Sequence, residues 1–122
     1  MSDTTYWVCD SCDNKINTLE DGWVQWTYRG IERPVLMKFG IVHHRVAAER
    51  LGIMRGCYLD ELSLPKGEYL QDGHLDWFVG PTGLDRLLRI LERSEYVPVG
   101  WVEIVRRLHI PGYETERQEL IE

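Results

Sequence analysis

Three cysteines and one pair of histidines constrain the fold of this chain more than any other feature of its sequence. Cys9 and Cys12 form a C-x2-C motif, a spacing that lets both thiolates point at one ion while backbone amides donate to the sulfurs. One of the two later histidines, together with Cys57, completes a Cys3His set, which is a common composition of tetrahedral structural zinc sites. We therefore predict one structural Zn²⁺, with the ligands Cys9, Cys12, His43 and Cys57.

Other roles for the cysteines fit the sequence less well. An odd number of cysteines cannot be paired completely into disulfides. A redox-active C-x2-C pair usually lies between a strand and a helix of a βαβ unit, and the sequence around Cys9 has no such pattern. The alternative for Cys57 is that it is an ordinary buried thiol and not a ligand, because free cysteine packs as a small apolar side chain. Metal ligation is the interpretation that uses all three thiols.

The two adjacent histidines compete for one ligand position. Neighbouring residues of a strand point to opposite faces of a sheet. The apolar residues before the pair occupy odd positions, namely Val35, Met37, Phe39 and Ile41. His43 continues this inward series and is the preferred ligand. A strand that ends here would break the alternation, so His44 stays open as the alternative to His43.

The N-terminal half is predicted to be β structure around the C-x2-C motif. Residues 23–28 are rich in β-forming side chains, residues 33–42 alternate, and residues 29–32 between them predict a turn. Ligands before and after such a hairpin are typical of a zinc-ribbon or treble-clef-like unit, in which the metal holds together a sheet too small to be stable alone. Further along, residues 46–51 predict a helical turn that ends at Gly52.

The C-terminal half has helical periodicity. Residues 82–85 match a capping box, and a second helix is expected to begin near Pro98 and to end before residues 110–112. Residues 113–121 predict a short third helix. Within the first helix the leucines recur at the spacing of one helical face, at Leu84, Leu87, Leu88 and Leu91.

Length and composition fit one domain of this kind. The 122 residues, 43% of them apolar, suffice for a single core. We expect one α+β domain over residues 1–122, with a zinc-binding, β-rich half at residues 1–75 packed against two or three helices at residues 76–122. No apolar run is long enough to span a membrane and the N-terminus lacks the pattern of an export signal, so we expect a cytoplasmic protein without membrane contact. The net charge of -6 disfavours nonspecific attraction to nucleic acid.

The order of these motifs resembles that of a group of small, poorly characterised bacterial proteins. The segments that carry the resemblance are CDSC, IVHH, Cys57, WFVGPTGLDRLLRIL and VEIVRRLHIPGYETER. Proteins of this group pair an N-terminal zinc-binding knuckle with a helical tail that contains a GLxxLL and a RLxIPGYExxR segment. The resemblance spans most of the chain, and the stretch between His44 and Cys57 is longer here than in the group. It implies a zinc-binding protein of unassigned role and no catalytic residues.

Two other functions are compatible with parts of the sequence. Helices joined by a short break could form a DNA-binding regulator with Arg106, Arg107 and Arg117 toward the duplex, although acidic residues outnumber arginines in this half. A nuclease of the His-Asn-His kind would use a histidine of the 43/44 pair as general base beside a second metal ion. The segment after His44 offers no asparagine for such a site.

The ligand count favours a noncatalytic role. Four protein ligands leave zinc no open position for water or substrate, and three thiolates make it a weak Lewis acid. We therefore expect a noncatalytic module that binds another protein, with nucleic acid as a less favoured partner. Aromatic anchors dominate such interfaces, and here the candidates, unless they belong to the core, are Trp7, Trp23, Trp26, Tyr28 and Trp77.

Overall fold

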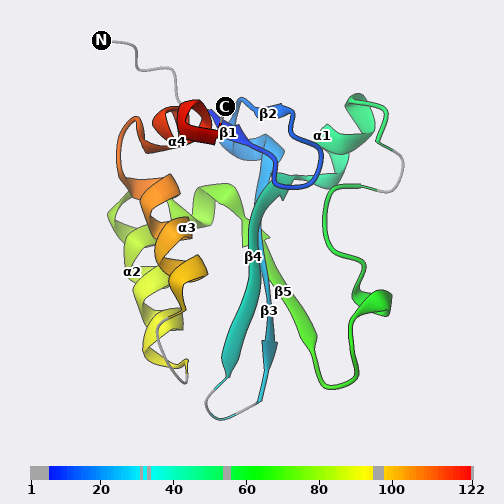
Figure 1. The fold of residues 1–122 in the computed structure, drawn as a ribbon, viewed down its shortest axis with the longest axis vertical. Helices are drawn as coiled ribbons and strands as arrows, with labels where there is room; N and C mark the ends of the chain where they lie inside the picture. The colour runs from blue at the N-terminus through cyan, green and yellow to red at the C-terminus, as the bar shows by residue number, and fades with distance from the viewer. Residues whose placement is uncertain (1–5, 31, 33, 54–55, 95–97, 122) are drawn as a thin grey trace.

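The computed structural model describes residues 6–30, 32, 34–53, 56–94 and 98–121, and it has the mixed α+β fold that the sequence predicts (Figure 1). The strands are β1 (Trp7–Val8), β2 (Lys15–Ile16), β3 (Gly22–Arg29), β4 (Val35–His43) and β5 (Tyr69–His74). The α-helices are α1 (Arg45–Arg50), α2 (Gly80–Glu92), α3 (Val99–His109) and α4 (Tyr113–Ile121). Helices α2 and α3 lie beside the three-stranded sheet, and α4 lies next to the β1–β2 ribbon at one end of it (Figure 1).

The predicted hairpin forms from β3 and β4, and it contains a bulge. The register shifts where Gln25 pairs with Gly40 but Thr27 pairs with Met37, and Lys38 in the bulge has a φ of 53°. A bulge of this kind inserts a residue and reverses the alternation of side chains between the faces. The predicted turn residue 31 and strand residue 33 lie outside the described residues.

The bulge changes which residues of β4 face the core. Before it, Leu36 is buried, whereas Val35 and Met37 are only partly buried. After it, Ile41, Val42 and His43 are all almost completely buried. The expectation that the odd positions form the buried face is therefore wrong before the bulge, and after it burial no longer alternates.

The third strand of the sheet, β5, did not emerge from sequence analysis. It pairs antiparallel with β3, from Tyr28 opposite Tyr69 to Trp23 opposite His74, and gives the strand order β4-β3-β5. Its sequence, YLQDGH, contains no β-branched residue and no alternation of apolar side chains. Pairing with β3 therefore places this strand in the sheet, without support from local propensity.

The helices follow the predicted pattern with shifted starts. Helix α1 ends as expected, with Gly52 in the left-handed region at a φ of 80°. Helix α2 begins at Gly80 with Val79 as its N-cap, so the predicted capping box that starts at Thr82 is wrong. Pro81 starts the helix earlier, because its fixed φ suits the first turn. Pro98 is the N-cap of α3.

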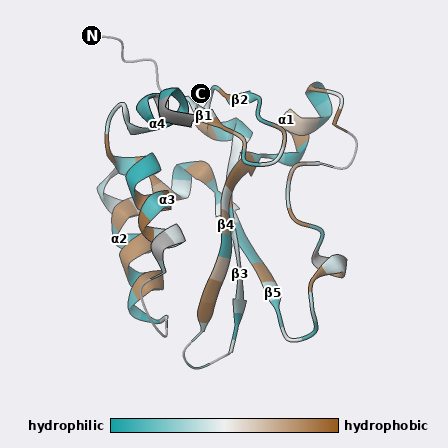
Figure 2. Cartoon of the chain, in the orientation of Figure 1, coloured by the Kyte–Doolittle hydropathy of each residue, from teal (hydrophilic) through white to brown (hydrophobic). Residues whose placement is uncertain are grey.

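A core of aromatic rings joins the sheet to α2 and α3. Trp26 of β3 meets Trp101 edge-on with ring centroids 5.2 Å apart, and Phe78 at 6.1 Å. The Trp101 indole N–H donates to the carbonyl of Leu87 at 3.1 Å, so this buried ring keeps its hydrogen bond. Leu88, which the helical stripe placed inside, is 44% exposed. Figure 2 shows brown, apolar residues along α2, α3 and β4, whereas α4 is mostly teal and therefore polar.

None of the described helices is both long and apolar enough to cross a membrane.

Gly83 permits the close approach of α2 to the preceding chain. A Cβ atom at this position would lie 2.2 Å from the backbone carbonyl carbon of Phe78, which cannot move aside as a side-chain end can. We expect Gly83→Ala to lower the free energy of unfolding by about 1–3 kcal/mol, in spite of the better helix propensity of alanine. Urea denaturation followed by tryptophan fluorescence measures the change.

The matched control is Thr82→Ala, because Thr82 is exposed on the same helix. We expect its effect to stay within about 0.5 kcal/mol. Equal stabilities of the two variants would contradict the close packing at Gly83.

Candidate metal centre

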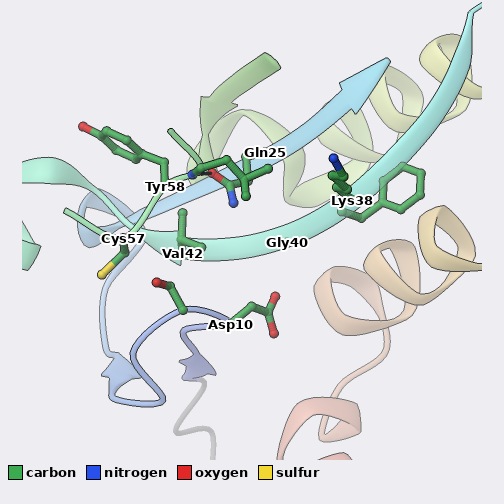
Figure 3. Close-up of a pocket in the computed structure, with 10 residues that line it drawn as sticks. Asp10, Gln25, Lys38, Gly40, Val42, Cys57 and Tyr58 are labelled. Atoms are coloured by element: carbon green, nitrogen blue, oxygen red, sulfur yellow. Dashed lines mark hydrogen bonds between the residues drawn. The ribbon is translucent and has the colours of Figure 1, made fainter. Parts of the chain in front are cut away.

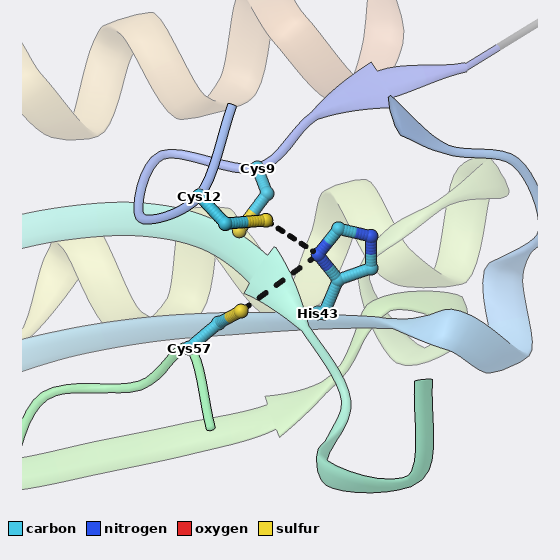
Figure 4. A group of neighbouring side chains, drawn as sticks. All are labelled: Cys9, Cys12, His43 and Cys57. Carbon is cyan, nitrogen blue, oxygen red and sulfur yellow. Dashed lines mark hydrogen bonds between the residues drawn. The ribbon is translucent and has the colours of Figure 1, made fainter. Parts of the chain in front are cut away.

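The structure brings together the four residues that sequence analysis selects as ligands (Figure 4). The ligand atoms of these residues all lie within 4.8 Å of one another. The Nδ1 atom of His43 is 3.3 Å from the sulfur of Cys12 and 3.8 Å from that of Cys57. Together with Cys9, these residues form a Cys3His cluster that could hold a metal ion.

Three separate parts of the chain supply these side chains. Cys9 and Cys12 lie in the turn between β1 and β2, His43 ends β4, and Cys57 lies in the loop after α1. The turn is closed by backbone hydrogen bonds, in which the N–H of Cys9 donates to the carbonyl of Asn14 at 3.0 Å. Closing the turn places the two sulfurs beside the end of the hairpin.

His43 is oriented by a hydrogen bond on the far side of its ring. Its Nε2 atom lies 2.9 Å from the carbonyl oxygen of Lys15. A carbonyl oxygen can only accept, so Nε2 carries the proton and Nδ1 directs a lone pair toward the sulfurs. A backbone carbonyl in this position is a common partner of metal-binding histidines. The imidazole is therefore held in the tautomer that a metal ligand needs.

The sulfurs receive hydrogen bonds from their own turn. The backbone N–H of Ser11 donates to the sulfur of Cys9 at 3.4 Å, and the side-chain amide of Asn14 donates to that of Cys12 at 3.5 Å. Such N–H donors stabilise negative charge on sulfur.

The three thiols cannot all ionise easily without a cation. Burial raises the pKa of Cys9. Burial, followed by the charge of Cys9 nearby, raises the pKa of Cys57 to about 12. Burial also opposes ionisation of Cys12, but hydrogen bonds from Asn14 and from the other cysteines outweigh it and lower the pKa of Cys12. A bound divalent ion would offset the repulsion among three thiolates, so the donor set fits a cation.

His44, the alternative ligand, lies outside the cluster. Its Nδ1 atom accepts from the backbone N–H of Val46 at 3.3 Å and so caps α1. Its ring lies against Trp23 and His74, with centroids 4.8 Å and 5.6 Å away. Of the two histidines, only His43 therefore lies beside the cysteines.

Asp10, inside the C-x2-C motif, connects the cluster to the C-terminal helices. Its Oδ2 atom accepts from the backbone N–H of Ile41 at 2.7 Å and from Arg107 at 2.6 Å. Arg107 also donates to the carbonyl of Val8 at 3.0 Å and to both carboxylate oxygens of Glu114, at 2.8 Å and 2.7 Å. Sequence analysis missed this network because no local pattern links residues 97 positions apart.

The same network affects the arginines named for the DNA-binding alternative. The side chain of Arg107 is only 3% exposed, and that of Arg117 is 24% exposed and lies 3.2 Å from Glu103. Contacts with DNA phosphates need accessible cations. Of the three candidate arginines, only Arg106 is exposed.

The candidate aromatic contact residues divide between core and surface. Trp7 and Trp26 are buried, Trp23 and Tyr28 are partly buried, and Trp77 is 47% exposed. Trp7 also donates its indole N–H to the carbonyl of Arg107 at 3.0 Å. Trp7 and Trp26 are therefore core residues.

Removal of the Arg107 side chain would leave the buried carboxylate of Glu114 and the partly exposed carboxylate of Asp10 without their closest cation, because Arg117 lies farther away, at 3.5 Å and 3.9 Å. We expect Arg107→Ala to lower the free energy of unfolding by about 3–5 kcal/mol. Arg106→Ala is the matched control, because the neighbouring side chain is exposed, and we expect a change within about 0.5 kcal/mol. Chemical denaturation of both variants provides the test, and a small effect at Arg107 would show that the network is dispensable.

Comparisons with protein-family models, with curated proteins and with solved structures gave no match for this chain. Its function is therefore inferred from the fold and from the Cys3His cluster.

Proposed function

We propose that the Cys3His cluster binds one Zn²⁺ ion. The observation that carries this proposal is the convergence of three sulfurs and one imidazole nitrogen within 4.8 Å. Tetrahedral zinc, with bonds of about 2.3 Å to sulfur and about 2.0 Å to nitrogen, places these two atom types about 3.6 Å apart. The distances of 3.3 Å and 3.8 Å from His43 to Cys12 and Cys57 are close to this value. Thiolate and imidazole are also the donors that zinc favours.

The ion has a structural role in this proposal. Cys9, His43 and Cys57 are 0%, 2% and 3% exposed, and only Cys12 is partly exposed, so most of the cluster is shielded from water and substrate. Four protein ligands leave no coordination position for catalysis. The zinc instead joins a two-residue ribbon, the end of a hairpin and a loop, in a treble-clef-like arrangement, and contributes directly to the stability of these segments.

The zinc-bound domain acts as a noncatalytic, cytoplasmic protein-interaction module, of the kind represented by the small bacterial proteins with a zinc knuckle and a helical tail. Support comes from rings that gather at one end of the sheet. Trp23 lies 5.5 Å from Tyr58 and 5.2 Å from His74, which in turn lies 4.8 Å from the exposed Trp77. Exposed aromatic side chains such as Trp77 are frequent anchors of protein interfaces.

The other two functions gain no support from the geometry. The nuclease would need His44 as a free base, but this ring caps α1 and stacks near Trp23 and His74. The DNA-binding regulator would need Arg107 at the surface, where it is not. DNA binding at low salt that is lost in Arg106→Ala would nevertheless favour the regulator.

The histidine pair offers a direct test of the ligand set. We expect the purified protein to contain one zinc per chain, His44→Ala to retain it, and His43→Ala to lose most of it after dialysis, because only His43 faces the sulfurs. Elemental analysis by mass spectrometry measures the metal content. Loss of zinc from His44→Ala with retention in His43→Ala would refute the assignment.

The structural role is tested within the C-x2-C turn. We expect Cys12→Ser to lose both zinc and cooperative unfolding, because the turn then lacks one ligand, whereas the neighbouring Ser11→Ala keeps both. Circular dichroism during thermal unfolding, with and without a chelator, measures the effect. A metal-free wild-type protein that unfolds cooperatively at an unchanged temperature would contradict a structural zinc.

A further inference from the structure

A cavity of about 350 Å³ adjoins the metal cluster (Figure 3). It lies between the C-x2-C turn, the β3–β4 hairpin and the loop that follows Cys57. Residues on its walls include Asp10, Gln25, Gly40, Val42 and Tyr58. This volume lies at the lower end of the range of small-ligand sites and suits one compact group.

Gly40 provides the floor of the cavity. A Cβ atom built on Gly40 would lie 3.5 Å from Oδ2 of Asp10 and 3.7 Å from Nε2 of Gln25. These are ordinary contact distances, so an alanine would fit without strain. Its methyl group would nevertheless occupy space between the carboxylate and the amide, and the absence of a side chain keeps that space open.

Gln25 directs a hydrogen-bond donor into this space. The side chain is 5% exposed, and its Oε1 atom accepts from the backbone N–H of Leu59 at 3.1 Å. This bond fixes the amide, so that Nε2 points into the cavity (Figure 3). Nε2 forms no hydrogen bond with the described residues, and it is not one of their fully buried unpaired polar atoms, so it is open to water in the cavity. An acceptor on a ligand would replace this water.

The charges around the cavity are already compensated. Asp10 is paired with Arg107 at 2.6 Å, and Lys38 at the rim is paired with Glu68 at 2.7 Å. An ionic ligand would therefore bring an uncompensated charge into the site. The Oδ1 atom of Asp10 is 3.9 Å from Arg117, beyond hydrogen-bond distance, and so it can still accept from a neutral donor.

We propose that this cavity binds the carboxamide group of a neutral ligand. The carbonyl oxygen of the ligand accepts from Nε2 of Gln25, and its NH2 group donates to Oδ1 of Asp10. The adjoining carbon atoms lie against Val42 and the ring of Tyr58. A carboxamide is a compact neutral group that carries one such acceptor and one such donor on neighbouring atoms. The proposal adds a ligand site to the structural role of zinc and does not depend on which metal is bound.

The test uses the isotope-labelled, metal-loaded full chain, titrated with propionamide and followed by NMR. We expect saturable shifts of the Gln25 side-chain amide and of the Gly40 backbone amide, with a dissociation constant on the order of 10 mM for so small a ligand. Propionate and propylammonium are similar in size to propionamide but carry a charge. We expect each of them to bind about tenfold more weakly than propionamide, or weaker still. No saturation with propionamide, or equal binding of propionate, would overturn the proposal.

Two variants assign the binding to this cavity. Gly40→Ala fills the floor, and Gln25→Glu keeps an acceptor for Leu59 but replaces the donor. We expect each to weaken propionamide binding about tenfold or more, while Thr82→Ala, on the distant surface of α2, binds as the wild type does. Retained amide dispersion in the NMR spectrum shows that a variant is folded. Wild-type affinity in a folded Gly40→Ala variant would refute the site.

The carboxamide could belong to a free small amide or to a glutamine side chain of a protein partner. Capped Gly-Gln-Gly and Gly-Glu-Gly peptides distinguish these sources. Tighter binding of the glutamine peptide than of propionamide supports a protein partner, and weaker binding supports a free amide. Metal content is measured on the same sample. If a sample that contains no zinc still binds propionamide, the zinc proposal is refuted and the proposed amide site is not.

Discussion

The guanidinium group of Arg107 makes the contacts that hold the β1–β2 ribbon and the C-x2-C turn against the C-terminal helices. It holds the backbone of β1, the carboxylate inside the C-x2-C turn and Glu114 of α4 at once. Glu114 in turn accepts from the backbone N–H of Val8 at 3.0 Å. Arginine suits this position because its planar fork directs several donors to fixed acceptors. A ribbon of two-residue strands has little stability of its own, so its place beside the hairpin depends on such contacts.

The bulge at Lys38 has a comparable effect on the metal centre. It shifts the register of β4 by one residue between Leu36 and His43, and both residues are buried. His43 lies beside the sulfurs, while His44 caps α1. The bulge also lies beside the cavity, since Lys38, Phe39 and Gly40 all line it. One irregularity in one strand thus shapes both candidate sites.

The metal centre and the cavity share their walls. Asp10 and Ser11 lie between the two cysteines of the turn, and Tyr58 follows Cys57 directly. A metal ion that orders the turn and the loop would therefore also order the cavity. In the two proposals, the zinc holds the turn and the loop rigid, while the turn and the hairpin together provide the hydrogen-bonding groups of the amide site.

The sequence by itself determined the three cysteines and the histidine pair as candidate ligands, the central hairpin, the helical C-terminal half and the α+β class. These follow from residue type, from ligand spacing and from local periodicity, all of which act over short stretches of chain. Tertiary structure decided which histidine faces the cysteines, the third strand β5, and the burial of Arg107. Each of these depends on pairing between distant segments: a bulge opposite β3, a strand without β-branched residues, and an ion pair across 97 positions. Such choices are made by the free energy of the assembled core, which no local pattern encodes.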